Sequence, residues 1–321
     1  MKKVSVIIPC YNCVQSVSDI MCDMEKQTIG IENLEIILVD DASTDDTLQS
    51  LCSWEEKYPE SVLVIHCEEN GKQGTARNVG LQYASAPYIG FVDADDRIET
   101  KMFELLYQAA ETTRSEVILC QSVKEETFVS KEENTLQIQE VPEIASEEER
   151  EVLLERQWNA AVWNKLYRRD FLTEHEICFV PGKFYEDIFF TELVKLSVRK
   201  YCVIDNVLYH HIFYKESSSH SVSDELRAFD FLEVHMDLIE EVRRRELYRR
   251  YESHFVKKFF VAYLAFMSDY ERCVGGFPLE MRDIVIEAIK ALFPNCRDLP
   301  FIKAVLQGEQ EKWKRYISYL C

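Results

Sequence analysis

The chain carries two carboxylates in the triplet Asp93-Ala94-Asp95, which follows an apolar run at residues 88–92. On an extended segment alternate side chains lie on the same side, so both carboxylates face the same way. Mg²⁺ and Mn²⁺ bind in proteins through one or two carboxylates together with the phosphates of a substrate. The triplet therefore predicts a divalent cation site. The alternative is an aspartate-rich turn that caps the next helix.

A second acidic pair, Asp40-Asp41, follows another apolar run at residues 34–39. One acidic pair after a strand is weak evidence, because aspartate is common at helix starts. Two acidic clusters at the same edge of one sheet would repel each other. A hard cation with oxygen ligands would compensate that charge.

A glycine-containing loop at residues 70–80 supplies positive charge through Lys72 and Arg77. Thr75 can start a helix within it. The amino terminus of a helix, together with basic side chains, suits a phosphate group. The loop is not a P-loop, because the order Gly-Lys-Ser/Thr is absent.

Strands and helices must position these residues, and they alternate along the first part of the chain. Apolar runs predict strands at residues 4–8, 34–39, 62–66, 88–92 and 117–120. Helix-compatible segments lie at residues 14–27, 47–57, 75–84 and 101–111. The alternation indicates an α/β fold with a mostly parallel sheet flanked by helices, in which ligands sit at the carboxyl ends of the strands. The pattern at residues 222–321 predicts a helical C-terminal subdomain.

The composition argues against several classes of protein. The net charge of −20 repels a phosphate backbone, so we expect no nucleic-acid partner. No stretch approaches the ~20 apolar residues that span a bilayer, and the first residues lack a secretory signal. The 11 cysteines are scattered, without zinc-finger spacing. We expect a cytoplasmic protein with free thiols.

Four motifs resemble, in sequence and order, those of glycosyltransferase family 2, a group of inverting transferases with a GT-A fold. The motifs are Val4–Asn12, Leu38–Asp45, Gly74–Gly80 and Phe91–Asp96. The resemblance implies a Rossmann-like GT-A domain at residues 1–221. Its nucleotide-sugar half would cover about residues 1–122, and its acceptor half about residues 123–221.

The resemblance also implies roles in the donor site. Tyr11 would stack on uracil and Pro9 would line the base pocket. Asp41 would accept a hydrogen bond from the uracil N3–H, with Asp40 supporting that turn. The residues expected around the diphosphate, ribose and sugar are Lys72, Arg77, Asp93 and Ala94.

For the metal, the resemblance implies Asp95 as the main ligand, with Asp93 beside it. In many GT-A enzymes a late histidine completes the metal shell. His211 or His220 is the candidate here, and the alternative is that both are structural histidines.

A later acidic motif of the family fits Phe184–Asp187. It implies that Asp187 is the catalytic general base and that Glu186 is its neighbour. The alternative is that both carboxylates only favour the positive end of the helix that follows.

The implied function is a metal-dependent, inverting glycosyltransferase with Mn²⁺ or Mg²⁺ as cofactor. It would move a hexosyl or N-acetylhexosaminyl group from a nucleotide sugar, with UDP-sugars favoured, to a hydroxyl of a bacterial surface glycan or a lipid-linked acceptor. Capsule and cell-wall polysaccharide biosynthesis are the expected contexts. A second hypothesis is a catalytically silent, nucleotide-sugar-binding partner of a glycan synthase complex. A nucleotidyltransferase is disfavoured, because such enzymes usually carry a basic, glycine-rich loop directly after the first strand.

The basic residues Arg243–Arg245 and Arg249–Arg250 allow two interpretations. They form a solvated face paired with glutamates, or they draw the protein to anionic lipid at the inner face of the plasma membrane. Self-association into a homo-oligomer is also left open.

Overall fold

The computed structural model describes residues 1–131, 135–156, 158, 160–213, 224–274, 279–308 and 311–320. The chain divides into two compact units, residues 1–217 and 218–321. The candidate strand-end residues of the sequence all belong to the first unit.

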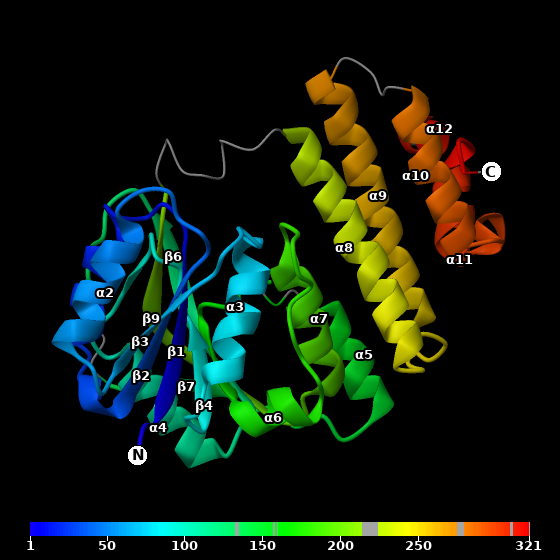
Figure 1. Cartoon of the computed structure of the whole chain (residues 1–321). Coiled ribbons are helices and arrows are strands. Elements are labelled where there is room, and N and C mark those ends of the chain that lie inside the picture. The colour runs from blue at the N-terminus through cyan, green and yellow to red at the C-terminus, as the bar shows by residue number, and fades with distance from the viewer. Residues whose placement is uncertain are drawn as a thin grey trace. The chain divides into compact units, whose positions relative to one another are not determined.

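The first unit contains one sheet, whose strands run in the order β3-β2-β1-β4-β8-β6-β9-β5, with β7 paired to β9 (Figure 1). The strands are β1 Val4–Cys10, β2 Leu34–Asp40, β3 Val62–His66, β4 Tyr88–Phe91, β5 Arg97–Ile98, β6 Val117–Glu125, β7 Ile138–Glu140, β8 Lys165–Arg168 and β9 Tyr201–Ile212.

Four neighbouring strands, β3, β2, β1 and β4, are parallel, with Cys10 opposite Asp40 and Asp40 opposite His66. Their carboxyl ends therefore meet at one edge of the sheet, as the sequence predicts. β8 runs antiparallel to both β4 and β6, while β6 and β9 are parallel. The mixed, mostly parallel sheet confirms the predicted fold class, although the antiparallel strands were not predicted.

Helices cover both faces of this sheet. Apolar residues of α1 (Val17–Glu25), α2 (Thr47–Lys57) and α4 (Met102–Thr113) share one core with alternate residues of β1 and β2. α3 (Lys72–Tyr83) covers the opposite face so closely that a side chain at Gly80 would come within 2.4 Å of Ile7. The remaining helices of this unit are α5 Glu147–Glu155, α6 Arg169–Glu174 and α7 Glu186–Ser197.

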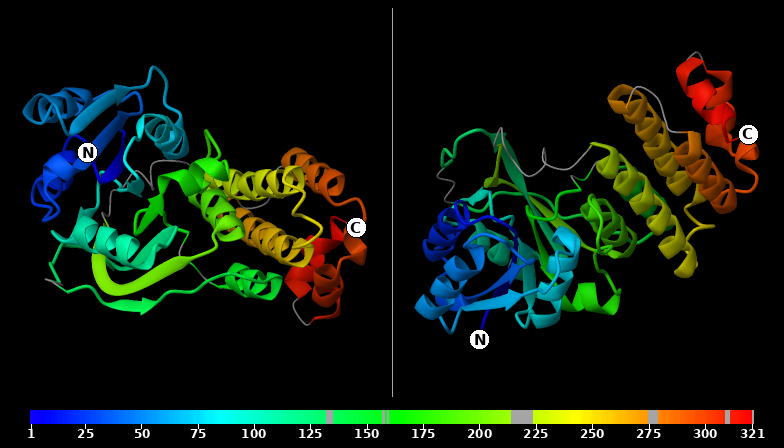
Figure 2. Two further views of the ribbon diagram at one scale, coloured as in Figure 1. Left: turned by 90° about the horizontal axis from the view of Figure 1, so that it is seen from below. Right: turned by 45° about the horizontal axis from the view of Figure 1, so that its top comes forward.

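The second unit is helical in its described residues, which confirms the predicted helical C-terminal region. Its helices are α8 Asp224–Arg244, α9 Glu252–Val274, α10 Leu279–Leu292, α11 Pro300–Gln307 and α12 Glu311–Ser318. α8 and α9 pack side by side (Figure 2). Over the described ranges, no helix is long and apolar enough to cross a membrane.

The arginines at the end of α8 make contacts within the same unit. Arg244 and Arg245 each lie 2.7 Å from Glu241. Arg243 donates a hydrogen bond to the carbonyl of Leu292 (2.7 Å). These contacts favour the solvated, paired face over a face that is free to bind lipid.

Candidate active site

The loop after β1 is tied to the loop after β2 by short polar side chains. Asn12, in the left-handed region (φ 47°), donates its N–H to Ser43 Oγ (3.0 Å) and accepts from the N–H of Thr44 (2.8 Å). Asparagine adopts this conformation more readily than most residues. Pro9 is buried, and Tyr11 as a whole residue is 47% exposed. A fixed loop thus presents an exposed aromatic ring on which a planar base can stack.

Both carboxylates at the end of β2 are buried and hydrogen-bonded. Oδ2 of Asp40 lies 2.7 Å from Nδ1 of His66. Oδ1 of Asp41 accepts the N–H of Gly71 (2.8 Å), which fixes the loop before α3 against β2. Burial raises the pKa of Asp41, and the N–H groups of Gly71 and Lys72 oppose that rise. Asp41 therefore has a carboxyl group fixed in place beside the Tyr11 loop.

α3 begins at Lys72, whose Nζ lies 4.5 Å from the ring centroid of Phe184. Further along α3, the side chain of Asn78 donates to the carbonyl of Phe179 (2.8 Å) and accepts its N–H (2.9 Å). These contacts seat α3 against the segment that leads into α7, and the two helices lie next to each other in Figure 1. The predicted phosphate loop and the predicted base are thus neighbours.

Arg77 of α3 is the electrostatic centre of the site. Its guanidinium donates to Oδ1 of Asp93 (2.7 Å) and to Oε1 of Glu186, and its side chain is only 3% exposed. Burial alone lowers the pKa of Arg77, but the charges of Asp93 and Glu186 outweigh it and hold that pKa above its ordinary value. From the sequence we expected Arg77 near the diphosphate or donor sugar. In the structure its guanidinium is ion-paired with two carboxylates, those of Asp93 and Glu186.

Asp95 stands between Asp93 and Asp96 in the turn after β4. Burial, followed by the negative charges of Asp96 and Asp93, raises the pKa of Asp95 to about 7. In the described part of the chain, no other side chain makes an ion pair or hydrogen bond with its carboxylate. A positive charge nearby would therefore stabilise the ionised form of Asp95.

Asp187 is the second residue of α7, directly after Glu186. Burial raises the pKa of Asp187, while the positive charges of Arg77 and Lys165 act in the opposite direction. Its Oδ1 accepts the N–H of the next residue, Ile188 (2.9 Å), within the first turn of α7. The role of Asp187 as general base stays a prediction.

The model of the family "Glycosyl transferase family 2" matches residues 5–175, more than half of the chain. The chain belongs to glycosyl transferase family 2. The matched range contains the loops after β1, β2 and β4, together with α3. It ends before Asp187.

Two curated relatives share about a third of their residues with this chain over the aligned range. The uncharacterized glycosyltransferase YibD of Escherichia coli (strain K12) is 31% identical over 68% of this chain and 63% of YibD. The uncharacterized glycosyltransferase EpsJ of Bacillus subtilis (strain 168) is 32% identical over 59% of this chain and 53% of EpsJ. The chain thus spans less than two thirds of either relative.

Among solved structures, Staphylococcus aureus TarS 1-349 has the same fold. It superposes with a TM-score of 0.70 at 22% identity, over 99% of this chain and 88% of that one. The same protein in complex with UDP gives 0.71 at 23% identity, with equal coverage. Its curated sequence is named poly(ribitol-phosphate) beta-N-acetylglucosaminyltransferase TarS (strain MW2), and is 26% identical over 88% of this chain and 47% of TarS.

Asp96, His211 and Tyr209 make contacts beside these carboxylates that the sequence did not predict. Asp96, considered mainly as a helix cap, is buried and accepts the hydroxyl of Tyr209 (2.7 Å). His211, a candidate metal ligand, turns its Nδ1 to Asp96 (3.1 Å), and that hydrogen bond raises the pKa of His211. His220 lies outside the described residues. No role for Tyr209 is predicted from the sequence.

Lys165 of β8 is a further buried group beside the site. Its Nζ donates to the carbonyl of Ala161 (2.5 Å) and to Oδ1 of Asn164 (2.9 Å). Burial lowers the pKa of Lys165 to about 7, although the charges of Cys120 and Asp187 act to raise it. These contacts make Lys165 part of the scaffold beside the site.

Proposed function

We propose that this chain is a metal-dependent, inverting glycosyltransferase that moves a hexosyl or N-acetylhexosaminyl group from a UDP-sugar to an acceptor hydroxyl. The observation that carries the proposal is the buried guanidinium of Arg77 between Asp93 and Glu186. This link holds the metal-motif turn and the helix of Asp187 in one place. A donor bound at the first would have its sugar next to the second.

The donor base occupies the loops after β1 and β2. Tyr11 stacks on the uracil, Pro9 lines the pocket, and Asp41, supported by Asp40, accepts the N3–H. TarS, which has the same fold, is described in complex with UDP and with UDP-GlcNAc. Lys72 at the start of α3 attracts the diphosphate, and Asp93 with Ala94 borders the ribose and sugar.

A divalent cation fits the carboxylates of the β4 turn. Asp95 has a pKa raised by burial and by two neighbouring carboxylates, so a positive charge stabilises it. Within the described residues no group of three or more His, Cys, Asp or Glu side chains forms a complete metal cage. The few carboxylates of the β4 turn suit Mg²⁺ or Mn²⁺, because these cations bind through one or two carboxylates plus substrate phosphates. When bound, the cation supplies Lewis-acid stabilisation of the diphosphate leaving group.

Asp187 acts as the general base. It takes the proton of the acceptor hydroxyl while the acceptor oxygen forms a bond to the anomeric carbon. At the same time the bond between the anomeric carbon and the phosphate oxygen of UDP breaks, and its electron pair leaves with UDP. Such proton transfer typically contributes 10²–10⁴-fold to the rate. Glu186, held by Arg77, fixes the first turn of α7 and thus the position of its neighbour.

The acceptor is a surface glycan or a lipid-linked glycan. Relatives are named for a polymer or a lipid as acceptor: TarS and a Bacillus spizizenii protein for poly(ribitol-phosphate), and a Borreliella burgdorferi protein for cholesterol. We place the reaction in the cytoplasm, at the inner face of the plasma membrane where the acceptor is lipid-linked. Residues 1–221 would carry the chemistry, and residues 222–321 form a helical subdomain.

The test is a transfer assay with UDP-glucose, UDP-galactose and UDP-N-acetylglucosamine. UDP release is followed with and without poly(ribitol-phosphate) or a lipid-linked glycan acceptor. Acceptor-dependent release that needs Mn²⁺ or Mg²⁺ and disappears in Asp187→Asn supports the proposal. Tight binding of a UDP-sugar without transfer to any acceptor would favour the silent partner of a synthase complex instead.

A further inference from the structure

We propose that Tyr209 of β9 is a positioning residue for Asp95, because its hydroxyl holds both ends of the turn that carries this carboxylate. The inference rests on the proposed function, since it concerns the metal–donor site. Tyr209 acts through the turn and touches neither donor nor acceptor.

The Tyr209 hydroxyl makes two hydrogen bonds across the turn. It accepts the backbone N–H of Asp93 (3.1 Å) and donates to Oδ2 of Asp96 (2.7 Å). The N–H of Asp96 in turn donates to the carbonyl of Asp93 (3.2 Å), which closes the turn. A phenol can donate one hydrogen bond and accept another, so both contacts are satisfied at once.

Asp95 lies inside this closed turn. Since its carboxylate has no side-chain partner among the described residues, the backbone of the turn sets its direction. The far end of the turn is fixed again by β9, because Asp96 also accepts the N–H of Ile212 (2.9 Å). A change at the Tyr209 hydroxyl therefore reaches Asp95 through two anchoring points.

Tyr209 itself is held rigidly. Its ring is fully buried and stacks on Trp163, with centroids 4.2 Å apart. The strand register places Ile98 of β5 opposite Tyr209, and the N–H of Glu99 donates to the carbonyl of Leu208 (3.0 Å). The chain that leaves the Asp95 turn thus pairs directly with the strand that carries the hydroxyl.

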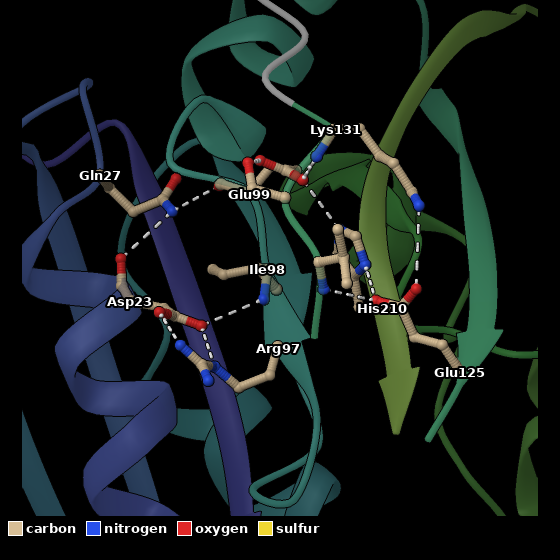
Figure 3. Close-up of polar contacts among 10 residues, drawn as sticks. Asp23, Gln27, Arg97, Ile98, Glu99, Glu125, Lys131 and His210 are labelled. Atoms are coloured by element: carbon tan, nitrogen blue, oxygen red, sulfur yellow. Dashed lines mark hydrogen bonds and ion pairs between the residues drawn. The ribbon is translucent and has the colours of Figure 1, made fainter. Parts of the chain in front are cut away.

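The next residue of β9 locks this register from the other side of the strand. His210 is buried between two carboxylates, with Nε2 2.9 Å from Glu99 and Nδ1 2.6 Å from Glu125 (Figure 3). Glu99 belongs to the chain that follows β5, and Glu125 ends β6. His210 therefore joins three segments around the end of β9.

An ion pair holds β5 to α1. Arg97 donates to both carboxylate oxygens of Asp23 (2.6 and 2.8 Å), and Asp23 also accepts the N–H of Ile98 (3.3 Å) (Figure 3). Because β5 and β9 are both held by these contacts, the Tyr209 hydroxyl has a fixed position. Outer-shell groups of this kind typically change metal affinity 10- to 100-fold when removed.

The experiment compares Tyr209→Phe with Tyr167→Phe in the full chain. The Tyr167 hydroxyl is buried and has no hydrogen-bond partner within the described part of the chain, so its loss is the matched control. Mn²⁺ is titrated into each protein with saturating UDP, and free Mn²⁺ is read by electron paramagnetic resonance. UDP affinity without metal is measured by calorimetry.

We expect Tyr209→Phe to bind Mn²⁺ 10- to 100-fold more weakly than wild type, with metal-free UDP affinity unchanged, and Tyr167→Phe to match wild type. Equal Mn²⁺ affinity in Tyr209→Phe and wild type would overturn the inference alone. A wild-type protein that binds no Mn²⁺ in the presence of UDP would overturn the proposed metal-dependent function, and the inference with it.

Hydrogen exchange separates positioning from loss of fold. The Asp93 amide should exchange faster in Tyr209→Phe, because it loses its acceptor, while amides in the middle of β1 and β9 keep their protection. Unchanged exchange of the Asp93 amide would contradict the positioning role, whatever the metal affinity.

Discussion

Arg77 of α3 and Glu186, the first residue of α7, form a buried ion pair although 109 residues separate them in the chain. The same guanidinium binds Asp93 after β4. One side chain thus sets the spacing between the metal-motif turn and the helix of the proposed base. Arginine suits this position, because its planar, always-charged group can serve two carboxylates at once.

Replacing Arg77 by Gln should destabilise the fold, because Asp93 and Glu186 would remain as buried carboxylates without their cation. Removing one partner of a buried pair costs about 3–5 kcal/mol. Urea unfolding at neutral pH measures the loss. Lys57→Gln, at an exposed pair with Glu25, is the control and should change the free energy of unfolding far less. If both variants lowered the free energy of unfolding equally, the buried ion pairs of Arg77 would not stabilise the fold more than an exposed pair does.

Asp187→Asn should lower kcat by about 10²–10⁴-fold while leaving UDP affinity unchanged, because the amide cannot take the acceptor proton. Initial rates of UDP release and calorimetric UDP binding measure the two effects separately. Asp170→Asn changes a carboxylate whose side chain is 71% exposed on α6, and should retain wild-type turnover. Undiminished transfer by Asp187→Asn would remove the base assignment.

Lys165 gives a pH dependence of known sign. Its pKa is about 7 in the folded protein and about 10.4 in an unfolded chain. Between these values the unfolded chain binds the extra proton, so the free energy of unfolding should rise with pH over that interval. Urea unfolding at pH 7 to 10 should show this rise in wild type and a smaller rise in Lys165→Met.

The exposed Lys303, at the surface of the helical unit, serves as the control. Lys303→Met should keep the wild-type pH slope. If Lys165→Met also follows the wild-type slope, the buried ammonium does not titrate in this range.

The candidate site residues could be predicted from the sequence, because each lies in a local motif. Asp41 and Asp95 follow strands, and parallel strands bring such residues to one edge. Asp187 was predicted from a motif that the structure places at the start of α7. The sheet class followed from alternating apolar runs.

The partners of these residues could not be read in the same way. Asp96 and Tyr209 are 113 residues apart, and their contact depends on the register of β9 against β5. β8, which lies antiparallel between β4 and β6, is also hard to predict, because a four-residue strand gives little sequence pattern of its own. Arg77 was assigned to a phosphate because its carboxylate partners become visible only when α3 packs on α7.

The most direct test of the account is a thermal-shift comparison of UDP with other nucleoside diphosphates, with and without Mn²⁺, on wild type and Asp95→Ala. A ligand at 100 times its Kd stabilises the fold by about 2.7 kcal/mol. We predict a clear shift for wild type with UDP that increases with Mn²⁺, and no Mn²⁺-dependent increase for Asp95→Ala. A well-folded wild-type protein whose melting temperature no nucleotide changes would contradict the donor site at the carboxyl edge of the sheet.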